Sequence, residues 1–274
     1  MMPRLLVTGM TAVLLMGCVS KRGDAAEAPA IISATSPGVE GTAHGFPVLR
    51  DLAGRKLANG EFVQWLVNEH VHARITYEFS SAHRIEEKTV FRQKPRIIEE
   101  EWSWCEFKDG KVYRKFEVDF GSGKASSEKW DGKKFRRWAM NIKVEPDRMF
   151  AGYALALAIK NLRERLNHGE TIQLKAIGFT PKPRVVLVEI SHVGIDRIRM
   201  SDRVIESDRF VIHPRIPWFV RLFVTAPDMR IWLIHAPPAE FLRWEGPLIE
   251  PEDPMVRVDL LSGSQSEMAE PRRP

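Results

Sequence analysis

Cysteine is scarce in this sequence, with two residues among 274. So few thiols exclude a disulfide-stapled scaffold and a cysteine-rich zinc module. A strong charge imbalance is also missing, because 41 Lys and Arg stand against 36 Asp and Glu, for a formal net charge of +5. This small excess does not indicate nucleic-acid binding. Apolar residues make up 44% of the chain, which excludes disorder throughout its length.

A long hydrophobic run is absent as well, since a membrane-spanning helix takes about 20 apolar residues. Residues 5–16 form a largely apolar stretch after Arg4, and its length is typical of the hydrophobic region of a secretory signal. The next residues, Leu15-Met16-Gly17-Cys18, resemble the bacterial lipoprotein signal, with Met16 in place of the usual small residue.

The lipoprotein resemblance implies cleavage after Gly17, diacylation of the Cys18 thiol with palmitate-type chains, and acylation of the new amino group. Two or more acyl chains hold a protein firmly on a bilayer. In lipoproteins of the enteric type an Asp after the Cys favours the inner membrane, so Val19 implies the periplasmic side of the outer membrane of a Gram-negative-type bacterium. The alternative is an ordinary signal peptide with an accidental Cys.

Composition divides the chain into four parts. Residues 19–45 contain no aromatic residue, and fifteen of these 27 residues are Ala, Ser, Gly or Pro. Such a segment cannot bury enough apolar area to offset its ordering entropy. We therefore expect a signal peptide at 1–17, a lipidated Cys with a flexible tether at 18–45, one β-rich domain at 46–261 and a disordered tail at 262–274.

Extended runs dominate the first half of this domain, after a short helix or turn that we expect at 60–69. The pairs Asp109-Gly110 and Asp131-Gly132 separate such runs, and an Asp-Gly pair is a strong hairpin signal. A two-residue loop fixes register. Counting back from Asp109-Gly110 places Trp104 opposite Lys115 and Trp102 opposite Glu117, so that the two Trp residues and Lys115 share one face.

Residues 149–167 predict the helix of the domain, with Asp147 as N-cap and Gly169 as its C-terminal stop. Nearly every residue from Met149 to Ile159 is apolar, so the helix must be buried on more than one side. Strands with short connections are expected after it, at 170–179, 184–192, 196–205, 209–212, 217–224, 230–235 and 240–244.

The predicted fold is α+β and mainly β: a large curved antiparallel sheet, or half-barrel, of about ten or more strands that wraps one buried hydrophobic helix. This layout resembles the Lol-type half-barrel of the outer-membrane lipoprotein carrier and receptor, and an uncharacterised family of periplasmic β-rich domains. The passages that carry the resemblance are Leu166-Asn167-His168-Gly169-Glu170 and Asp228-Met229-Arg230-Ile231-Trp232. It implies the fold, and no lipid-handling residue is transferred from it.

Two sets of side chains are candidate binding residues. Trp218, Phe219, Trp102 and Trp104 predict an apolar groove or a membrane-facing rim, with a role in the core as the alternative. The basic cluster Lys133, Lys134, Arg136 and Arg137 predicts contact with anionic lipid. Its alternatives are a solvated face or pairing across strands with Glu99-Glu100-Glu101.

Other chemical motifs have plainer interpretations. His70 and His72 share one face of a strand, but no third metal ligand follows from the sequence, so no metal site and no cofactor are predicted. Cys105 is expected to be a buried core residue, and Gly121-Ser122-Gly123 a hairpin turn.

These observations favour a non-enzymatic, lipid-anchored periplasmic lipoprotein. It would bind a hydrophobic ligand, such as a lipid, an acyl chain or another lipoprotein, in the concavity of its sheet, or assist envelope assembly. The expected partners are the membrane and such an envelope component, and no nucleic acid. One alternative is a structural or interaction subunit of an envelope complex without a small ligand, and another is a hydrolase of unrecognised type.

Overall fold

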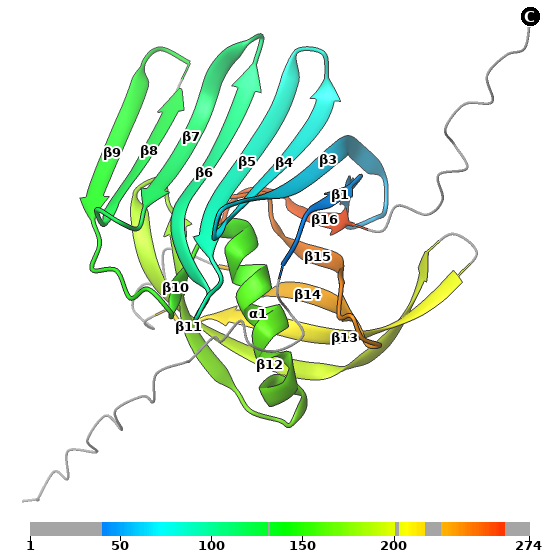
Figure 1. Cartoon of the computed structure of the whole chain (residues 1–274). Helices are drawn as coiled ribbons and strands as arrows, with labels where there is room; N and C mark the ends of the chain where they lie inside the picture. Colours follow the sequence, from blue (N-terminus) through cyan, green and yellow to red (C-terminus); the bar gives the residue numbers. More distant parts are fainter. Residues whose placement is uncertain (1–39, 131, 201–202, 217–225, 261–274) are drawn as a thin grey trace, which may run out of the picture.

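The computed structural model describes residues 40–130, 132–200, 203–216 and 226–260 (Figure 1). These residues form helix α1 (Gly152–Asn167) and sixteen strands. In chain order the strands are β1 (Ala43–Gly45), β2 (Val48–Asp51), β3 (Lys56–Val67), β4 (His70–Ser80), β5 (His83–Arg92), β6 (Ile98–Lys108), β7 (Lys111–Asp119), β8 (Lys124–Trp130), β9 (Phe135–Asn141), β10 (Met149–Phe150), β11 (Ile172–Phe179), β12 (Pro183–Met200), β13 (Arg203–Pro214), β14 (Met229–Ile234), β15 (Phe241–Pro247) and β16 (Met255–Asp259).

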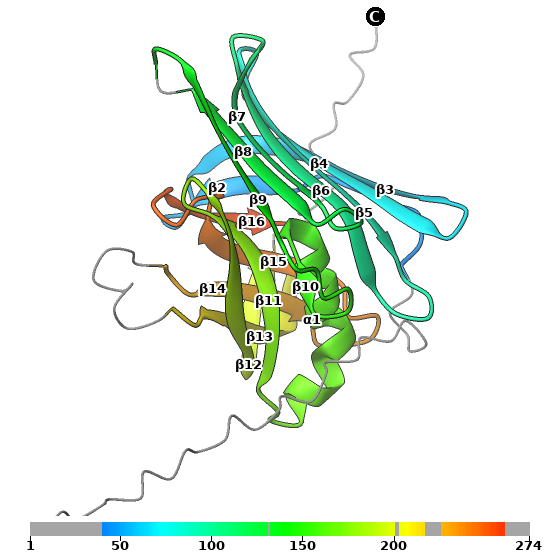
Figure 2. The same ribbon diagram turned by 90° about the vertical axis from the view of Figure 1, so that its left-hand side faces the viewer.

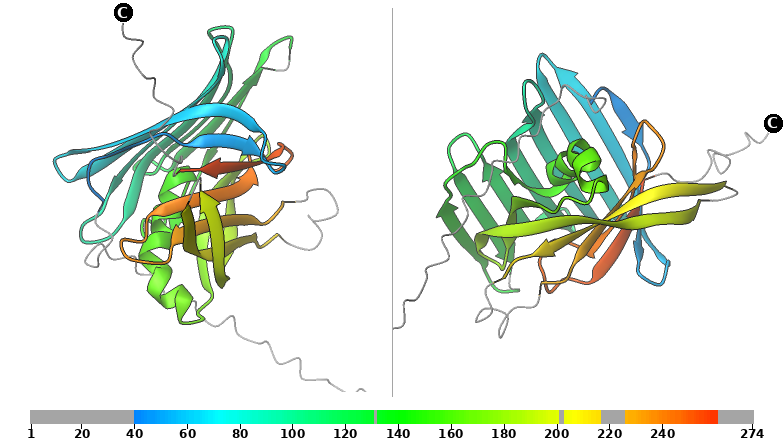
Figure 3. Two further views of the ribbon diagram at one scale, coloured as in Figure 1. Left: turned by 90° about the vertical axis from the view of Figure 1, so that its right-hand side faces the viewer. Right: turned by 90° about the horizontal axis from the view of Figure 1, so that it is seen from below.

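All the described strands belong to one sheet. Its order is β10-β11-β12-β13-β14-β15-β16-β2-β3-β4-β5-β6-β7-β8-β9, and β1 pairs with β3 beside this path. Among the described strands the pairs are antiparallel, except that β10 and β11 run parallel. Strand β16 pairs with β2 and so joins the late half of the chain to the early half. The sheet is open and curved around α1 (Figure 3), which confirms the predicted half-barrel.

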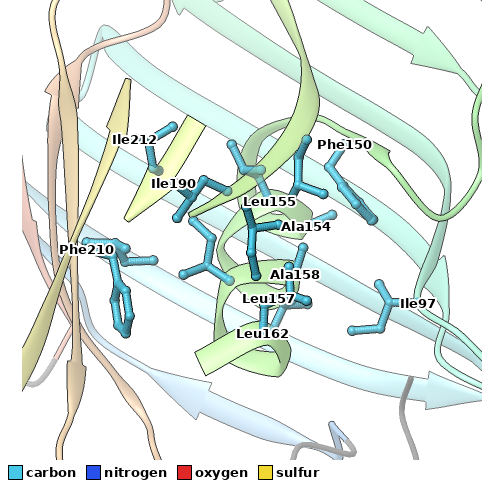
Figure 4. Packing of buried hydrophobic residues seen from close by; sticks show 14 of the residues in the cluster. Ile97, Phe150, Ala154, Leu155, Leu157, Ala158, Leu162, Ile190, Phe210 and Ile212 are labelled. Atoms are coloured by element: carbon cyan, nitrogen blue, oxygen red, sulfur yellow. The ribbon is translucent and has the colours of Figure 1, made fainter. Parts of the chain in front are cut away.

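Helix α1 lies within the concave side of the sheet (Figure 2). Its buried residues are Ala154, Leu155, Leu157, Ala158, Ile159, Leu162 and Leu166. They pack against apolar side chains from both halves of the sheet, including Val71, Phe91, Leu174, Ile190, Phe210, Ile212 and Ile231. Figure 4 shows Ile190, Phe210 and Ile212 near the helix. Burying each large apolar side chain contributes about 1.5–3 kcal/mol. Within the described ranges, no helix combines the length and the hydropathy that a membrane crossing requires.

The helix begins later than its sequence predicts. Met149 and Phe150 form β10 beside β11, so the helix starts at Gly152 and its N-cap is Ala151 instead of Asp147. Ala151 offers no side-chain cap. The apolar run does not mark the boundary, because the first residues of the run are buried equally well in a strand.

Two carboxylates of the sheet satisfy the helix start. Glu99 Oε2 accepts the Ala151 N–H at 2.6 Å. Glu87 Oε1 accepts the Tyr153 N–H at 2.8 Å and the Trp102 Nε1–H at 2.9 Å. These bonds satisfy amides that have no partner inside the helix. The N-terminus of α1 is therefore fixed to β5 and to β6.

The end of the helix is as predicted. Gly169 has a φ of +87°, in the left-handed region that glycine adopts without strain. Its N–H donates to the Leu166 carbonyl at 3.0 Å, and the Glu170 N–H donates to the Arg165 carbonyl at 3.2 Å. This C-terminal cap confirms Gly169 as the stop.

The segment 60–69, expected as a short helix or turn, lies mostly in β3. Phe62 and Gln64 are buried, whereas Trp65, Leu66 and Val67 at the strand end are exposed. Apolar residues in so short a run fit either a helix or a strand. Pairing with β4, from Asn59 opposite Glu78 onward, decides for the strand.

The hairpin at Asp109-Gly110 is present, but its register changes along the strands. Beside the turn, Lys108 pairs with Lys111 and Phe107 pairs with Val112, as a two-residue loop requires. A β-bulge follows, because Glu106 pairs with Arg114 and one residue of β7 is left over. Trp104 and Trp102 each pair one residue beyond the prediction, so Lys115 points to the other face of the sheet. Their partners are Phe116 and Val118.

Two further boundaries differ from the expectations. The runs 184–192 and 196–205 are not two separate strands, because β12 continues from the first run to Met200 through a bulge between His192 and Gly194, and the last residues of the second run belong to β13. A bulge shifts the alternation of side chains by one residue, which the sequence pattern shows as a break. The expected strand at 217–224 lies outside the described residues.

Residues 40–45, which their composition assigns to the tether, belong to the folded domain. Strand β1 pairs with β3. The Glu40 N–H donates to Gln93 Oε1 at 2.7 Å, Gln93 Nε2 donates to the Glu40 carbonyl at 2.8 Å, and the Glu40 carboxylate lies 2.9 Å from Lys160 Nζ. Backbone pairing and polar contacts hold this segment in the domain, so it is ordered although its sequence has few large apolar residues.

The connection between β15 and β16 closes another part of the interior. Arg114 on β7 donates to Glu106 at 2.6 Å and to Glu250 and Asp253 at 2.9 Å each. The Glu250 side chain is completely buried. Removing one partner from such a cluster leaves an uncompensated buried charge, so the cluster holds the connection in place. The guanidinium also lies over the buried ring of Trp104.

Gly152 occupies the most constrained position of the helix start. Its φ is +43°, and a Cβ there would collide with Glu87 Oε1 and with Trp102 Nε1. Only a residue without a side chain leaves room for the bonds from Glu87 to α1 and to Trp102.

We therefore expect Gly152→Ala to destabilise the fold by about 1–3 kcal/mol or more, because strain at the backbone adds to the displacement of Glu87. Urea unfolding followed by tryptophan fluorescence measures this loss. Gly41→Ala is the control, since a Cβ at Gly41 meets no atom within 4 Å. A loss no larger than that of the control would contradict the role given to Gly152.

Candidate functional site

A groove crosses the face of the sheet that points away from helix α1. Its volume is about 920 Å³, and strands β3 to β9 line it. One row of residues that are partners across neighbouring strands runs along the middle of the groove. Most of the side chains in this row are buried on the opposite face of the sheet. This row is Ala73, Thr89, Trp102, Val118, Ala125 and Met140. The floor of this outer groove is therefore sheet backbone.

Two rows of outward-pointing side chains form the walls of the outer groove. One row is His72, Val90, Glu101, Asp119, Lys124 and Asn141. The other row is Arg74, Lys88, Ser103, Glu117, Ser126 and Ala139. Adjacent strands lie about 4.8 Å apart, so the track from β4 to β9 is about 24 Å long. A site of this shape accepts an elongated partner.

Charges in the outer groove are segregated along its length. The first basic band consists of Arg74 and Lys88, on β4 and β5. The acidic band on β6 and β7 consists of Glu101, Glu117 and Asp119, and the second basic band on β8 and β9 consists of Lys124 and Arg137. Trp65 lies at the β3 end, stacked on His72 with ring centroids 5.4 Å apart.

Within the part of the chain that the structure describes, three basic groups of the bands pair with carboxylates that lie beside the residues lining the groove. Lys88 Nζ lies 2.6 Å from Glu86, and the Arg137 guanidinium lies 3.3 Å from Glu128. The Arg74 Nη2 atom is 3.6 Å from Glu61, and its Nε atom is buried without a hydrogen-bond partner. Exposed pairs of this kind are worth about 0–1 kcal/mol. A bound partner can therefore replace them at little cost.

The acidic band carries a carboxylate that is held in its ionised form. Ser122 donates to Asp119 from its hydroxyl at 2.7 Å and from its backbone N–H at 2.9 Å. These hydrogen bonds hold the pKa of Asp119 below its usual value. The same contacts place Gly121-Ser122-Gly123 in the turn between β7 and β8, as the sequence predicts.

A separate polar cluster joins the end of α1 to strands β12 to β14. Asp208 accepts hydrogen bonds from Arg163 and His235 at 2.8 Å each. Burial opposes ionisation, but these bonds hold the pKa of Asp208 below its usual value. His192 Nε2 is 3.6 Å from the carboxylate, too far for a hydrogen bond. Ser207, which precedes Asp208 in the sequence, donates to the Asp196 carbonyl. The hydrogen bonds from Arg163 and His235 to Asp208 therefore tie the end of helix α1 to the sheet.

The structure places two of the predicted groove residues in the core. The side chains of Trp102 and Trp104 are 3% and 4% exposed. Trp102 stacks on Phe179, and Trp104 packs against Phe116. Both rings therefore have the alternative role in the core, instead of the predicted apolar groove or membrane rim, and Trp102 contributes backbone to the outer groove.

The predicted basic cluster lies at the β8–β9 hairpin. Lys133 and Lys134 belong to the connection, and Arg136 and Arg137 are exposed on β9. Contact with anionic lipid stays a prediction. The alternative that the basic cluster pairs across strands with Glu99-Glu100-Glu101 is wrong, because β7 and β8 separate β6 from β9. The three acidic residues have other surroundings: Glu99 is buried, Glu100 pairs with His70 and Arg92, and Glu101 lines the outer groove.

The remaining sequence candidates have ordinary partners. His70 Nδ1 lies 2.7 Å from Glu100, and His72 stacks on Trp65. Among the described residues, no group of three or more His, Cys, Asp or Glu side chains is arranged to hold a metal ion. Cys105 is half-buried on the outward face instead of in the core, because it alternates along β6 with Trp104 and Glu106, whose side chains are buried on the other face. Burial raises the pKa of its thiol to about 11.

Three predicted site residues lie outside the described residues: Cys18, Trp218 and Phe219. The residues that sequence reasoning missed are the two walls of the outer groove. Each wall residue alternates with a core residue along its strand, which is a signal present in the sequence. The order and register of six strands were needed to align these residues into one track.

No family model matches this chain, and no curated protein matches it in sequence. A solved structure with some similarity is that of the hypothetical lipoprotein YmcC from Escherichia coli K12. The TM-score is 0.34 and the identity 8%, over 83% of this chain and 87% of that chain. A likeness this low carries no inference about function.

The two buried acids at the helix start give a pH-dependent contribution to stability. Burial raises the pKa of Glu99 well above its usual value, and the charge of Glu87 raises it further. A carboxyl with a raised folded-state pKa keeps its proton when the unfolded chain has released it. The folded state therefore loses stability as the pH rises above the pKa that Glu99 has in the unfolded chain.

We expect Glu99→Gln to remove this loss, since the amide oxygen still accepts the Ala151 N–H and carries no charge. The difference in unfolding free energy between the variant and the wild type should shift in favour of the variant from about pH 5 to about pH 8. Urea unfolding at several pH values measures it, with the exposed Glu164→Gln as control. A difference that stays constant with pH would contradict a raised pKa at Glu99.

Proposed function

We propose that this protein is a lipid-anchored lipoprotein on the periplasmic side of the outer membrane. It acts without catalysis, as an interaction subunit that binds an elongated envelope partner in its outer groove. The observation that carries the proposal is the groove itself: an open track with a backbone floor and three alternating bands of charge.

The anchor is supported by Leu15-Met16-Gly17-Cys18 and Val19. The domain begins by Glu40, which is held at Gln93 and Lys160. A chain from Cys18 to Glu40 spans at most about 75 Å when fully extended. The domain can therefore work away from the bilayer surface while its lipid stays inserted.

The interior of the half-barrel supports an interaction subunit better than a carrier of acyl chains. Helix α1 occupies the concave side, with Ile159 and Leu166 completely buried. The Arg114 cluster holds the β15–β16 connection over another part of it. An acyl chain bound in this concavity would have to displace side chains that already pack closely.

The anchor is tested by metabolic labelling with palmitate and by fractionation of membranes. We expect the wild type to carry the label and to sediment with the outer membrane. Cys18→Ala should carry no label and appear in the soluble fraction, because its thiol acceptor is missing. Cys105→Ser is the matched control and should behave as the wild type. Label retained on Cys18→Ala would contradict the anchor.

The outer groove is tested in cells with a photoreactive amino acid at Ser103 or Ser126, on its walls. We expect one shared crosslinked partner from both positions, and a strong decrease with Arg74→Glu and Lys88→Glu, which reverse the first basic band. Glu78, exposed on β4 outside the groove, is the control position. Equal adducts from Glu78, or none from either serine, would contradict binding in the groove.

A further inference from the structure

The C-terminal segment after β16 has a charge pattern that matches the outer groove. Residues 262–274 read SGSQSEMAEPRRP, with acidic Glu267 and Glu270 followed by basic Arg272 and Arg273. In the groove, the first basic band is followed by the acidic band. The two patterns have the same order with opposite signs.

The spacing of the two patterns also agrees. The centres of the first basic band and of the acidic band are two strands apart, which is about 10 Å. Glu270 and Arg273 are three residues apart, which is also about 10 Å in an extended chain. A segment that runs from β4 towards β7 would place Glu270 near Arg74 and Lys88, and the two arginines near Glu101, Glu117 and Asp119.

The chain is long enough to reach the groove from the end of β16. Asp259 pairs with Val48 of β2, which pairs with Asn59 of β3, which pairs with Glu78 of β4. Three strand spacings across the sheet and four residues along β4 to Arg74 are perpendicular distances of about 14 Å each, so the direct distance is roughly 20 Å. The eight residues from Asp259 to Glu267 span about 26 Å when extended.

We propose that residues 262–274 bind in the half of the outer groove between β4 and β7, as an intramolecular competitor that the envelope partner must displace. Attachment to the same domain gives this segment an effective concentration on the order of millimolar, which favours it over the same segment of a second copy. Docking of the segment depends only on the groove. Its regulatory role rests on the proposed function.

The test is disulfide trapping in the full-length Cys18→Ala, Cys105→Ser protein. One cysteine replaces Ser103, which lies between Lys88 and Glu117 in the wall, and the other replaces Pro271, which lies between Glu270 and Arg272. Both substitutions leave every charge in place. We expect an intramolecular disulfide to form about tenfold faster than in a Ser80→Cys, Pro271→Cys control. Ser80 lies nearer the end of β16 along the sheet, so it would react first if the segment moved freely.

Charge reversal separates docking from chance collision. In the Ser103→Cys, Pro271→Cys protein, Glu267→Lys with Glu270→Lys should slow trapping to the rate of the control. Adding Arg74→Glu with Lys88→Glu should restore it, and about 1 M salt should abolish the difference. Matching thermal unfolding of all variants verifies that each one is folded.

Two results would overturn the proposal: equal rates at Ser103 and Ser80, or disulfides that form only between two molecules. Neither result affects the photocrosslinking of an envelope partner in cells, so this proposal and the proposed function fail separately. If both hold, removal of residues 262–274 should raise the yield of partner adducts at Ser103.

Discussion

The burial of helix α1 is the constraint on which the rest of the structure depends. Its apolar side chains cover most of its circumference, so a single flat layer cannot remove them from water. The sheet meets this demand by curving, and it supplies apolar residues from both of its halves. Glu87 and Glu99 fix the start of the helix against β5 and β6, which sets the depth at which it lies.

Features that depend on local sequence were predictable. The buried helix, its stop at Gly169 and the turn at Asp109-Gly110 each follow from a short stretch with a single physical interpretation. The start of the helix was not predictable, because the apolar residues Met149 and Phe150 fit a helical turn in the sequence pattern but pair with β11 in the structure. Residues 40–45 were missed because polar contacts to Gln93 and Lys160 hold them, and composition does not show such contacts.

The candidate site shows the same limit more sharply. Alternation along β4 to β9 indicates which residues face outward, but the position of each along the groove depends on register. One bulge at Glu106 moves Trp104 and Trp102 by one residue relative to β7. The displacement puts Phe116 and Val118, instead of Lys115 and Glu117, on the face of the two Trp rings, which is core, and it puts Glu117 in a wall of the groove on the opposite face. A site built from six strands cannot be assembled from sequence unless every bulge is known.

The pairing of β16 with β2 determines when the fold can be completed. Val258 lies opposite Leu49, although almost the entire domain separates these residues along the chain. Contacts between such distant segments form late, because a long loop must first close. A chain that leaves a translocation pore with its N-terminus first would present β2 as an unpaired edge until its final strand arrives. On the proposed export route, the half-finished sheet would need a chaperone to shield that edge until translocation is complete.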